Sequence, residues 1–202
     1  MHPTIFAAFD EICRQHTATG PVLEIGATAS ADTLLMLPSL ALVSERIGIN
    51  LVAPGTIGGC QILQGGAHDL SQFESGHFAT ILCNSMLEHD PRFWLTLAEI
   101  RRVARASALI VIGVPGFAAA PVTRHRGLLN RLRRLPSPWR RAMEIHLAGT
   151  SVLPPHHFPG DYYRFSEQAC REILMEGLEL LELRRLLDPP RFVAAGRKKF
   201  RD

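Results

Sequence analysis

The stretch V-L-E-I-G-A-T-A-S, Val22 to Ser30, decides the fold. Its first four residues are mostly apolar and predict a short buried β-strand that ends at Gly26. Gly26 has no side chain, so the backbone can approach a ligand closely at this point. A fully glycine-rich loop would carry glycine again at positions 28 and 30, where this chain has Thr28 and Ser30. The stretch therefore predicts a strand that leads into a modified ligand-binding loop.

The composition is that of one globular domain. The chain has 202 residues, of which 47% are hydrophobic, and this is enough to bury a sizeable core. The N-terminal segment has no basic region followed by an apolar core, so it does not resemble a signal peptide. The four cysteines are far apart in the sequence and form no C-x-x-C pair. We therefore expect a reduced protein with a cytoplasmic location and no metal site.

Apolar runs and helical patterns alternate along the chain, which predicts a parallel sheet with helices on both of its faces. The last two strands are joined by a connection too short for a parallel crossover, so they are expected to form an antiparallel hairpin. Pro54 to Gly59 is read as a turn. The predicted fold is α/β, with a seven-stranded, mostly parallel sheet. Strands are expected at 22–25, 46–52, 60–63, 77–84, 108–114, 180–187 and 192–196, and helices at 3–17, 30–37, 91–104 and 166–176.

Residues 115–160 form a basic segment that differs in composition from the rest of the chain. Between Gly116 and Pro159 there are seven arginines and one glutamate. Arg126 to Leu135 sets leucines against arginines, as an amphipathic helix does. The segment predicts an anionic substrate, a peripheral contact with an anionic membrane through residues 124–141, or a solvated helix over a pocket. Nucleic acid is not expected, because the segment lacks a series of aromatic residues for stacking on bases.

Four stretches of the chain carry a family resemblance: L-E-I-G-A-T-A (23–29), F-A-T-I-L-C-N-S-M-L-E-H (78–89), the run from Leu97 to Gly116 that ends in V-P-G, and D-Y-Y-R-F-S (161–166). They resemble motifs of the class I S-adenosylmethionine-dependent methyltransferases that act on small molecules. The resemblance covers residues 20–115 well and 156–180 less well. It implies a Rossmann-like fold in which residues 1–202 are a single methyltransferase-like domain and 115–160 is a basic lid or substrate segment.

Several positions depart from the family pattern. Thr28 and Ser30 replace glycines, and Asn50 and Gly66 stand where family members commonly have an acid. The R-P-G-G turn of the family is here Arg105 to Ala108. A neutral acceptor in place of a charged one weakens binding by about tenfold and does not abolish it.

The resemblance implies the cofactor S-adenosyl-L-methionine (SAM) and a set of residues that bind it. The loop at Gly26 would pass close to the cofactor, and Asn50 would accept hydrogen bonds from the ribose. His68 and Asp69 would lie near the adenine. The alternative for residues 22–30 is an ordinary strand–helix turn. The full predicted set of cofactor-binding residues is Glu24, Gly26, Thr28, Asn50, His68, Asp69 and Asn84.

Catalysis is expected at the carboxyl ends of the parallel strands, where His89 follows the fourth strand. His89 is a candidate base, and the alternative is that the Glu88-His89 pair only orders the following helix. The pair His156-His157 is either functional or part of a polar loop. The stretch D-Y-Y-R-F either contacts substrate or packs with Arg164 paired to an acid. The predicted catalytic residues are His89, His156 and Asp161, and the predicted substrate-binding residues are Arg124, His157, Tyr162 and Tyr163.

The predicted function is SAM-dependent O-methylation of a small-molecule, glycan-linked or lipid-linked acceptor, which the arginines suggest is anionic. The alternative is a degenerate methyltransferase fold that serves as a binding module without catalysis. A nicotinamide-dependent oxidoreductase is disfavoured, because no G-x-G-x-x-G follows the first strand.

Overall fold

The computed structural model describes the chain except residues 53, 120–149, 156–159 and 200–202. Its centre is an eight-stranded mixed sheet with the strand order β3-β4-β2-β1-β5-β6-β10-β9. The five strands β4, β2, β1, β5 and β6 are parallel, and β10 runs antiparallel to both β6 and β9. The strands are β1 (Val22–Ile25), β2 (Arg46–Asn50), β3 (Gly55–Ile57), β4 (Cys60–Gln64), β5 (Phe78–Asn84), β6 (Ala104–Pro115), β9 (Leu178–Leu186) and β10 (Arg191–Lys198).

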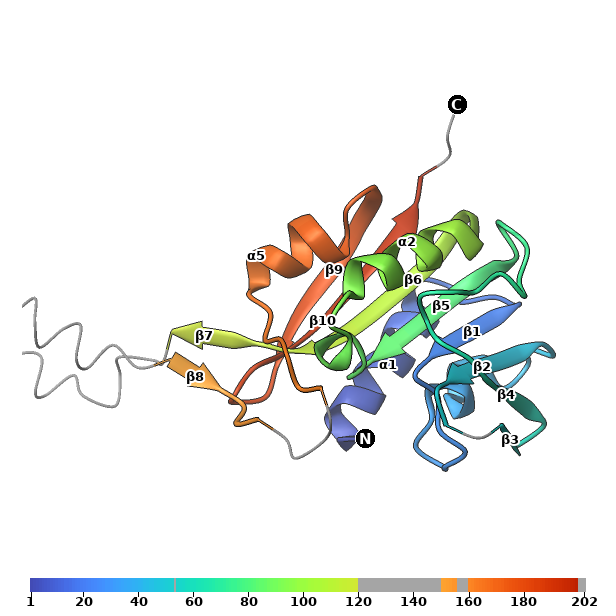
Figure 1. The fold of residues 1–202 in the computed structure, drawn as a ribbon, viewed down its shortest axis with the longest axis horizontal. Helices are drawn as coiled ribbons and strands as arrows, with labels where there is room; N and C mark the ends of the chain where they lie inside the picture. The colour runs from blue at the N-terminus through green and yellow to red at the C-terminus, as the bar shows by residue number, and fades with distance from the viewer. Residues whose placement is uncertain (53, 120–149, 156–159, 200–202) are drawn as a thin grey trace, which may run out of the picture.

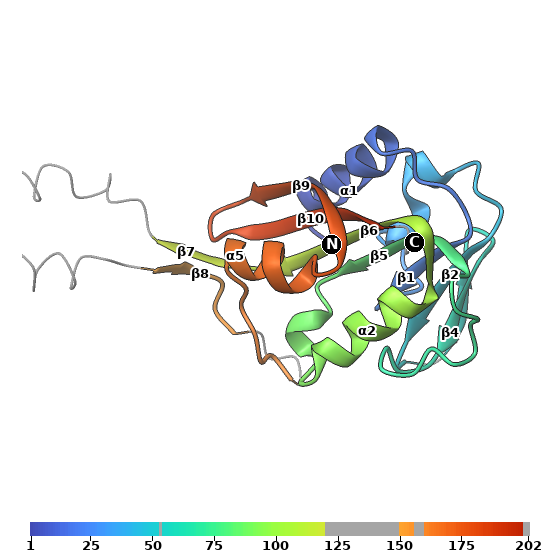
Figure 2. The same cartoon turned by 90° about the horizontal axis from the view of Figure 1, so that it is seen from above.

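Helices cover both faces of this sheet (Figures 1 and 2). Helix α1 (Pro3–Gln15) lies on one face. Helix α2 (Phe93–Val103) and helix α5 (Glu167–Ala169), which continues as the π-helical turn η5 (Cys170–Leu174), lie on the other. The predicted α/β fold with an antiparallel C-terminal hairpin is confirmed.

Alternation along β1 divides its side chains between two cores. Leu23 and Ile25 pack into the core under α2 and η5, whereas Val22 packs into the core under α1. Successive side chains of a strand point to opposite faces, so Glu24 must share the α1 face with Val22. A carboxylate is thereby placed at the centre of the sheet, only 4% exposed.

The main sheet has one strand more than the seven predicted. Residues Gly55–Ile57 pair antiparallel with β4 and form the edge strand β3. The turn is only Gly58-Gly59, where both residues have positive φ angles of 53° and 79°. A two-residue hairpin turn with two positive φ angles favours glycine at both places. The reading of Pro54–Gly59 as a turn was therefore too long.

The helix expected at 30–37 is also replaced. The chain instead forms two short 3₁₀ turns, η1 (Leu34–Met36) and η2 (Pro38–Leu40). Two causes are visible. The Glu24 carboxylate accepts hydrogen bonds from Thr33 Oγ1 and from Leu35 N, at 3.1 Å for the latter. Pro38 then disfavours a helical conformation for the residue before it.

A small two-stranded ribbon projects from the end of the main sheet (Figure 1). Its strands are β7 (Phe117–Ala119) and β8 (Thr150–Val152), paired antiparallel. Both strands belong to the basic segment 115–160, but the helix predicted at 126–135 lies outside the described residues. Among the helices of the described part of the chain, none is long and apolar enough to cross a membrane.

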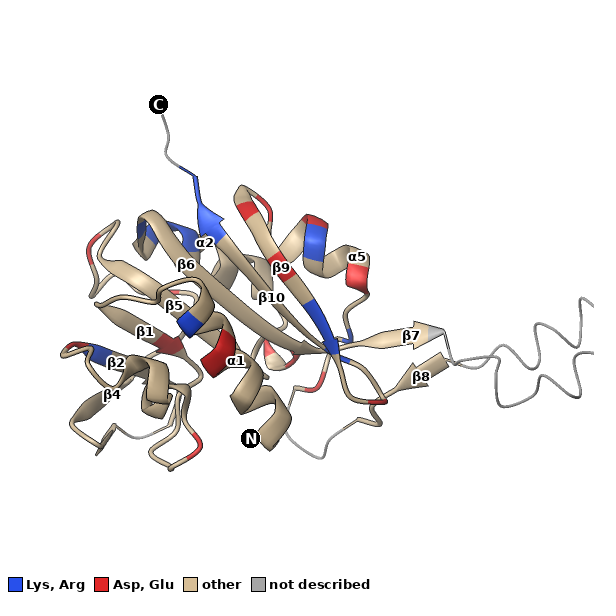
Figure 3. Cartoon of the chain, turned by 180° about the vertical axis from the view of Figure 1, so that it is seen from behind, with Lys and Arg blue, Asp and Glu red and all other residues tan. Residues whose placement is uncertain are grey.

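Ion pairs hold α1 against the edge strand β9, and charged residues of both elements appear on the same side in Figure 3. Arg184 of β9 donates to Glu11 of α1 and to Glu182, each at 2.5 Å. His16, just beyond α1, lies 2.8 Å from the same Glu182. The N-terminal helix is thus fixed to the C-terminal hairpin.

All four cysteines are buried and free. Burial raises the pKa of Cys13 and of Cys170 to about 12, and it raises the pKa of Cys83 well above its ordinary value.

Two leucine-to-alanine changes test this description of the core. Leu23 is fully buried in β1, whereas Leu42 is fully exposed. We expect Leu23→Ala to lower the free energy of unfolding by about 2–5 kcal/mol, because it leaves a cavity between the sheet and α2. Leu42→Ala should change it by less than about 0.5 kcal/mol. Urea unfolding measures both, and equal effects would contradict the assignment of the core.

Candidate cofactor and acceptor site

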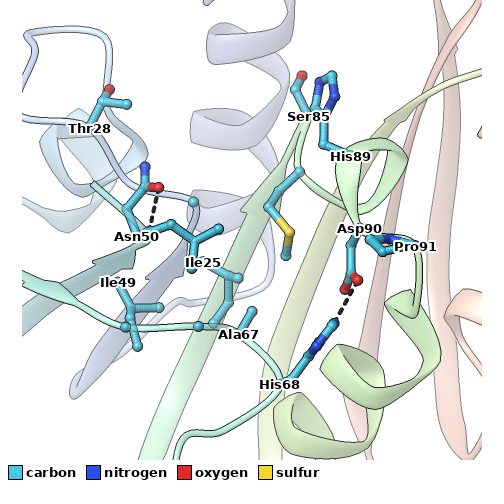
Figure 4. A pocket seen from close by; sticks show the side chains of 15 residues that line it. Ile25, Thr28, Ile49, Asn50, Ala67, His68, Ser85, His89, Asp90 and Pro91 are labelled. Atoms are coloured by element: carbon cyan, nitrogen blue, oxygen red, sulfur yellow. Dashed lines mark hydrogen bonds and ion pairs between the residues drawn. The ribbon is translucent and has the colours of Figure 1, made fainter. Parts of the chain in front are cut away.

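A cavity of about 480 Å³ opens at the carboxyl ends of the parallel strands (Figure 4). It lies where the chain turns in opposite directions from the neighbouring strands β1 and β5, the place at which open α/β sheets bind ligands. Its volume is within the range of small-molecule sites. The residues that line it are Ile25, Gly26, Thr28, Ile49, Asn50, Leu51, Gly65, Gly66, Ala67, His68, Ser85, Met86, His89, Asp90 and Pro91.

Gly26 begins the loop after β1 and needs to be glycine. Its φ is +83°, and a Cβ there would lie 3.1 Å from Cβ and Cγ of Met86. Any side chain would be strained and would press on the opposite wall of the cavity. Gly26 therefore keeps open the space between the loop after β1 and Met86, which follows β5.

Asn50 ties the loop after β1 to the end of β2. Its Nδ2 donates to the carbonyl of Ala27 at 2.7 Å, and its Oδ1 accepts from Leu51 N at 2.7 Å. A carbonyl oxygen has two lone pairs, so Oδ1 can still accept one hydrogen bond from a ligand hydroxyl. The predicted ribose acceptor is thus in the wall and held by the backbone.

The hydroxyl groups of Thr28 and Ser30 form a chain. Ser30 Oγ donates to Asp32 Oδ1 at 2.6 Å, and it lies 2.8 Å from Thr28 Oγ1. Since the only proton of Ser30 goes to the carboxylate, Thr28 must be the donor of the second bond. Thr28 then keeps only lone pairs for a ligand, which suits a cationic amino group.

His68 and Asp90 join two walls of the cavity (Figure 4). His68 Nε2 lies 2.6 Å from Asp90 Oδ1. Asp90 also accepts from Thr96 Oγ1 at 2.7 Å and from Arg92 N at 2.9 Å. His68 lies in the wall as predicted, but its partner Asp90 was missed. The pair joins the loop after β4 to the loop after β5, a contact between residues 22 positions apart.

Three predicted cofactor residues do not line the cavity. Glu24 points to the α1 face and binds Thr33 and Leu35, and burial raises its pKa. Asp69 is exposed and accepts from the backbone of Ser71 at 3.0 Å. Asn84 donates from Nδ2 to Ser85 Oγ at 3.0 Å, with its Oδ1 against Gly113. We correct the prediction for these three: Glu24, Asp69 and Asn84 have other partners.

The segment 161–165 packs against the protein rather than lining the cavity. Arg164 binds both oxygens of Asp161, at 2.5 and 2.7 Å. The hydroxyl of Tyr163 donates to the carbonyl of Pro91 at 3.0 Å, and its ring packs on Phe93. These contacts fit the packed alternative for D-Y-Y-R-F, and they correct the base role of Asp161 and the substrate role of Tyr163.

Tyr162 is 57% exposed and does not line the cavity. Its backbone N–H donates to the carbonyl of Glu88 at 2.8 Å, which holds this segment against the turn after β5. The predicted residues Arg124, His156 and His157 lie outside the described residues.

The polar groups that suit the predicted catalytic role lie in the part of the cavity wall formed by the residues after β5. His89 ends the 3₁₀ turn η3 (Leu87–His89) and lines the cavity. Ser85 precedes this turn with a φ of 53°, and it lines the same cavity as His89 (Figure 4). Ser85 Oγ accepts from Arg191 Nη2, which comes from β10. Ser85 was missed, because its partner lies 106 positions away in the sequence.

Glu88 lies between Leu87 and the lining residue His89 in the same turn, and it is fully buried. Burial raises the pKa of its carboxyl to about 7, against the opposing attraction of Arg191 and Arg164. The nearest guanidinium nitrogen, Arg191 Nη2, is 3.9 Å away.

Comparisons with known proteins agree with this geometry. Residues 35–112 match the model of a family described as a methyltransferase domain. The 1,6-didemethyltoxoflavin-N1-methyltransferase of Burkholderia thailandensis, solved with S-adenosylhomocysteine, superposes with a TM-score of 0.65 at 17% identity over 96% of this chain and 78% of its own. N-methyltransferase NodS of Bradyrhizobium japonicum gives 0.59 at 16% identity, over 96% and 86%. No curated protein has a significantly similar sequence.

A SAM-dependent methyltransferase of Methanosarcina mazei has nearly the same extent, covering 100% of this chain and 99% of its own at 18% identity and a TM-score of 0.56. The fold and the matched model agree with a class I S-adenosylmethionine-dependent methyltransferase domain. The resemblance read from the sequence is thereby confirmed.

The residues present fit the cofactor. Gly26 leaves the space that a Cβ would fill, and at Gly66 a Cβ would meet only Leu51 Cδ2, at 3.8 Å. Asn50 and Thr28 offer acceptors for hydroxyl and amino groups, and apolar side chains surround them. When bound, the cofactor supplies an activated methyl group on a sulfonium.

Asn50 provides a direct test of this fit. We expect Asn50→Ala to weaken SAM binding by about tenfold, because it removes the tie between two loops and one acceptor for the ligand. The matched control is Gln64→Ala, which loses a contact to the Leu51 carbonyl at an exposed position. Calorimetric titration measures both, and equal affinity in the two variants would contradict the role of Asn50.

The buried carboxyl of Glu88 makes stability depend on pH. Its pKa is about 7 in the folded chain and about 4.5 ordinarily, so the folded state binds the proton more tightly. Its contribution is full below pH 4.5 and is lost as the pH rises through 7. Between pH 5 and pH 8 we expect wild type to lose about 2–3 kcal/mol relative to Glu88→Gln. A constant difference across urea titrations at these pH values would contradict the burial of an ionisable carboxyl here.

Proposed function

We propose that this methyltransferase domain transfers the methyl group of SAM to a hydroxyl oxygen of a small-molecule, glycan-linked or lipid-linked acceptor. The observation that carries the proposal is the position of His89 in the cavity wall across from the modified loop. The titratable group therefore faces the same space in which Gly26, Thr28 and Asn50 would hold the cofactor.

Methyl transfer requires two contributions from the protein, namely positioning of the reactants and removal of a proton. Binding both reactants in one cavity places the acceptor atom in line with the methyl group, and such positioning supplies much of the rate. A hydroxyl acceptor must also lose its proton, and an imidazole is suited to take it. His89 would accept that proton at a ring nitrogen, with Ser85 beside it as a polar contact for the acceptor.

The nature of the acceptor is the finer part of the proposal. Two similar structures are named as N-methyltransferases, so nitrogen is the main competing acceptor atom. The arginines of residues 124–141 support an anionic acceptor or an anionic membrane surface as the partner. The buried, free thiols fit a reducing compartment and support the proposed cytoplasmic location.

The experiment combines radiolabelled SAM with pools of hydroxyl and amine acceptors, followed by mass spectrometry of the product. An O-methyl product supports the proposal, and an N-methyl product overturns the choice of oxygen. Micromolar SAM binding with no transfer to any pool would favour the alternative, a binding module that keeps the fold without catalysis.

His89 is tested with a matched histidine. We expect His89→Gln to lower kcat by about 10²–10⁴-fold while SAM affinity stays within about threefold, because the imidazole moves a proton and does not hold the cofactor. His77→Gln is the control, since His77 lies at the opposite end of β5 and pairs with Glu45 at 3.1 Å. An equal kcat for the two variants would remove His89 from the reaction.

A further inference from the structure

Glu88 is a buried acid with few partners, in the turn that contributes His89 to the cavity wall. It belongs to the turn η3 and is 0% exposed. No other residue in the described part of the chain donates a hydrogen bond to either of its carboxyl oxygens. Its backbone carbonyl, in contrast, accepts from the N–H groups of Tyr162 and Tyr163, which fix the turn in place.

The group that could balance a negative charge on Glu88 is Arg191, at 3.9 Å. Arg191 is itself largely buried, its Nε has no hydrogen-bond partner among the described residues, and its Nη2 is engaged with Ser85 in the cavity wall. Burial lowers the pKa of Arg191. The guanidinium is therefore shared between the cavity wall and a carboxyl that it does not contact closely.

We propose that the protonation of the Glu88 carboxyl depends on the charge of the ligand. The carboxyl releases its proton when SAM fills the cavity and keeps it when S-adenosylhomocysteine does. In the first case the O–H bond of the carboxyl breaks, the proton goes to solvent, and the carboxylate remains. The inference rests on cofactor binding to this cavity and deepens it, because it assigns a residue that distinguishes the cofactor from its product.

The argument is electrostatic. SAM and S-adenosylhomocysteine share the adenosine and the amino-acid group, and differ by a methyl group and one positive charge on sulfur. A cation in a site of low polarity favours the ionised form of a nearby acid. Glu88 precedes the lining residue His89, and Arg191 links its carboxyl to the cavity wall, because Arg191 donates to the lining residue Ser85 and lies 3.9 Å from Glu88 Oε1. Loss of that charge in the product would favour the protonated acid again, and SAM would be preferred more strongly at higher pH.

Most other titratable and charged groups around Glu88 are balanced by a partner or stay protonated. Asp161 and Arg164 neutralise each other in a two-pronged ion pair, and Asp90 is held by three hydrogen bonds. Burial keeps the Cys83 thiol protonated. His89 is the competing source of a proton, because it lines the same cavity. The groups that face Glu88 are Arg191 of β10, Arg164 and Asp161 of the segment 161–165, Cys83 of β5, and His89 and Asp90 at the end of η3.

The test is calorimetric titration of the whole chain with SAM and with S-adenosylhomocysteine at pH 7, in phosphate and in Tris. These buffers differ in their enthalpy of ionisation, so the difference in measured heat counts the protons released. We expect at most about 0.5 proton per SAM bound, because about half of the Glu88 carboxyls are protonated at this pH, and nearly none for S-adenosylhomocysteine. Equal release with both ligands would overturn the proposal.

Variants assign the proton to a residue. Glu88→Gln should abolish the extra release with SAM, whereas Asp69→Asn, an exposed acid beside the cavity wall, should leave it unchanged. Release that persists in Glu88→Gln and disappears in His89→Gln would assign the proton to His89 and overturn the proposal.

Two further outcomes keep the proposal separate from the cofactor site itself. If Glu88→Gln does not fold, the wild-type affinities decide, because the ratio of SAM to S-adenosylhomocysteine affinity should rise several-fold from pH 6 to pH 8. A flat ratio would overturn the role of Glu88 while leaving the cofactor site intact. Failure of both ligands to bind would overturn the cofactor site and the role of Glu88 together.

Discussion

The buried carboxylate of Glu24 is the interaction on which the cofactor side of the molecule depends. Strand alternation places it under the sheet, on the same face as α1, where a lone charge would be costly. It is stabilised by hydrogen bonds from Thr33 and Leu35, residues that follow the modified loop. These hydrogen bonds hold the end of the loop against the α1 face of the sheet. Residues 34–40 then form two short 3₁₀ turns instead of a full helix.

The cavity above this anchor is assembled by ties between loops rather than by single loops. Asn50 links the ends of β1 and β2, and the pair His68–Asp90 links the loops after β4 and β5. The first tie joins segments that leave neighbouring strands, and the second spans β2 and β1, which separate β4 from β5. The loops around the site are therefore braced across the parallel part of the sheet. The edge strand β3 adds to this support, because Gly55 lies so close to the modified loop that a Cβ there would be 3.2 Å from Ala29 Cβ.

Much of the fold could be predicted from the sequence because its signals are local. The apolar run at β5 and the glycine after β1 identify a parallel sheet and the end at which it binds ligands. Alternation also shows that Glu24 faces away from Leu23 and Ile25, a signal that was available and was not used. The Gly58-Gly59 pair is likewise a hairpin signal within a stretch that was read only as a turn.

The details of the site were harder to predict because they depend on contacts between distant residues. The hydrogen bond between Ser85 and Arg191 joins two residues that no local pattern connects. The ion pair of Asp161 with Arg164 could be predicted, in contrast, because the two residues are only three positions apart in the sequence. Residue type and position relative to a strand end predict which residues are near a cavity, but the hydrogen-bond partners decide which of them face it.

The burial of all four thiols has a practical consequence for studies of this chain. A thiolate is the form that reacts with alkylating reagents and oxidants, and a buried thiol with a raised pKa forms it rarely. Cys13 of α1 and Cys60 of β4 lie in the core on the α1 face, whereas Cys83 of β5 and Cys170 of η5 lie in the core on the opposite face. Alkylation of Cys13 and Cys60 therefore reports the opening of one core, and alkylation of Cys83 and Cys170 reports the opening of the other. Mass spectrometry can follow the unfolding of both faces without an added label.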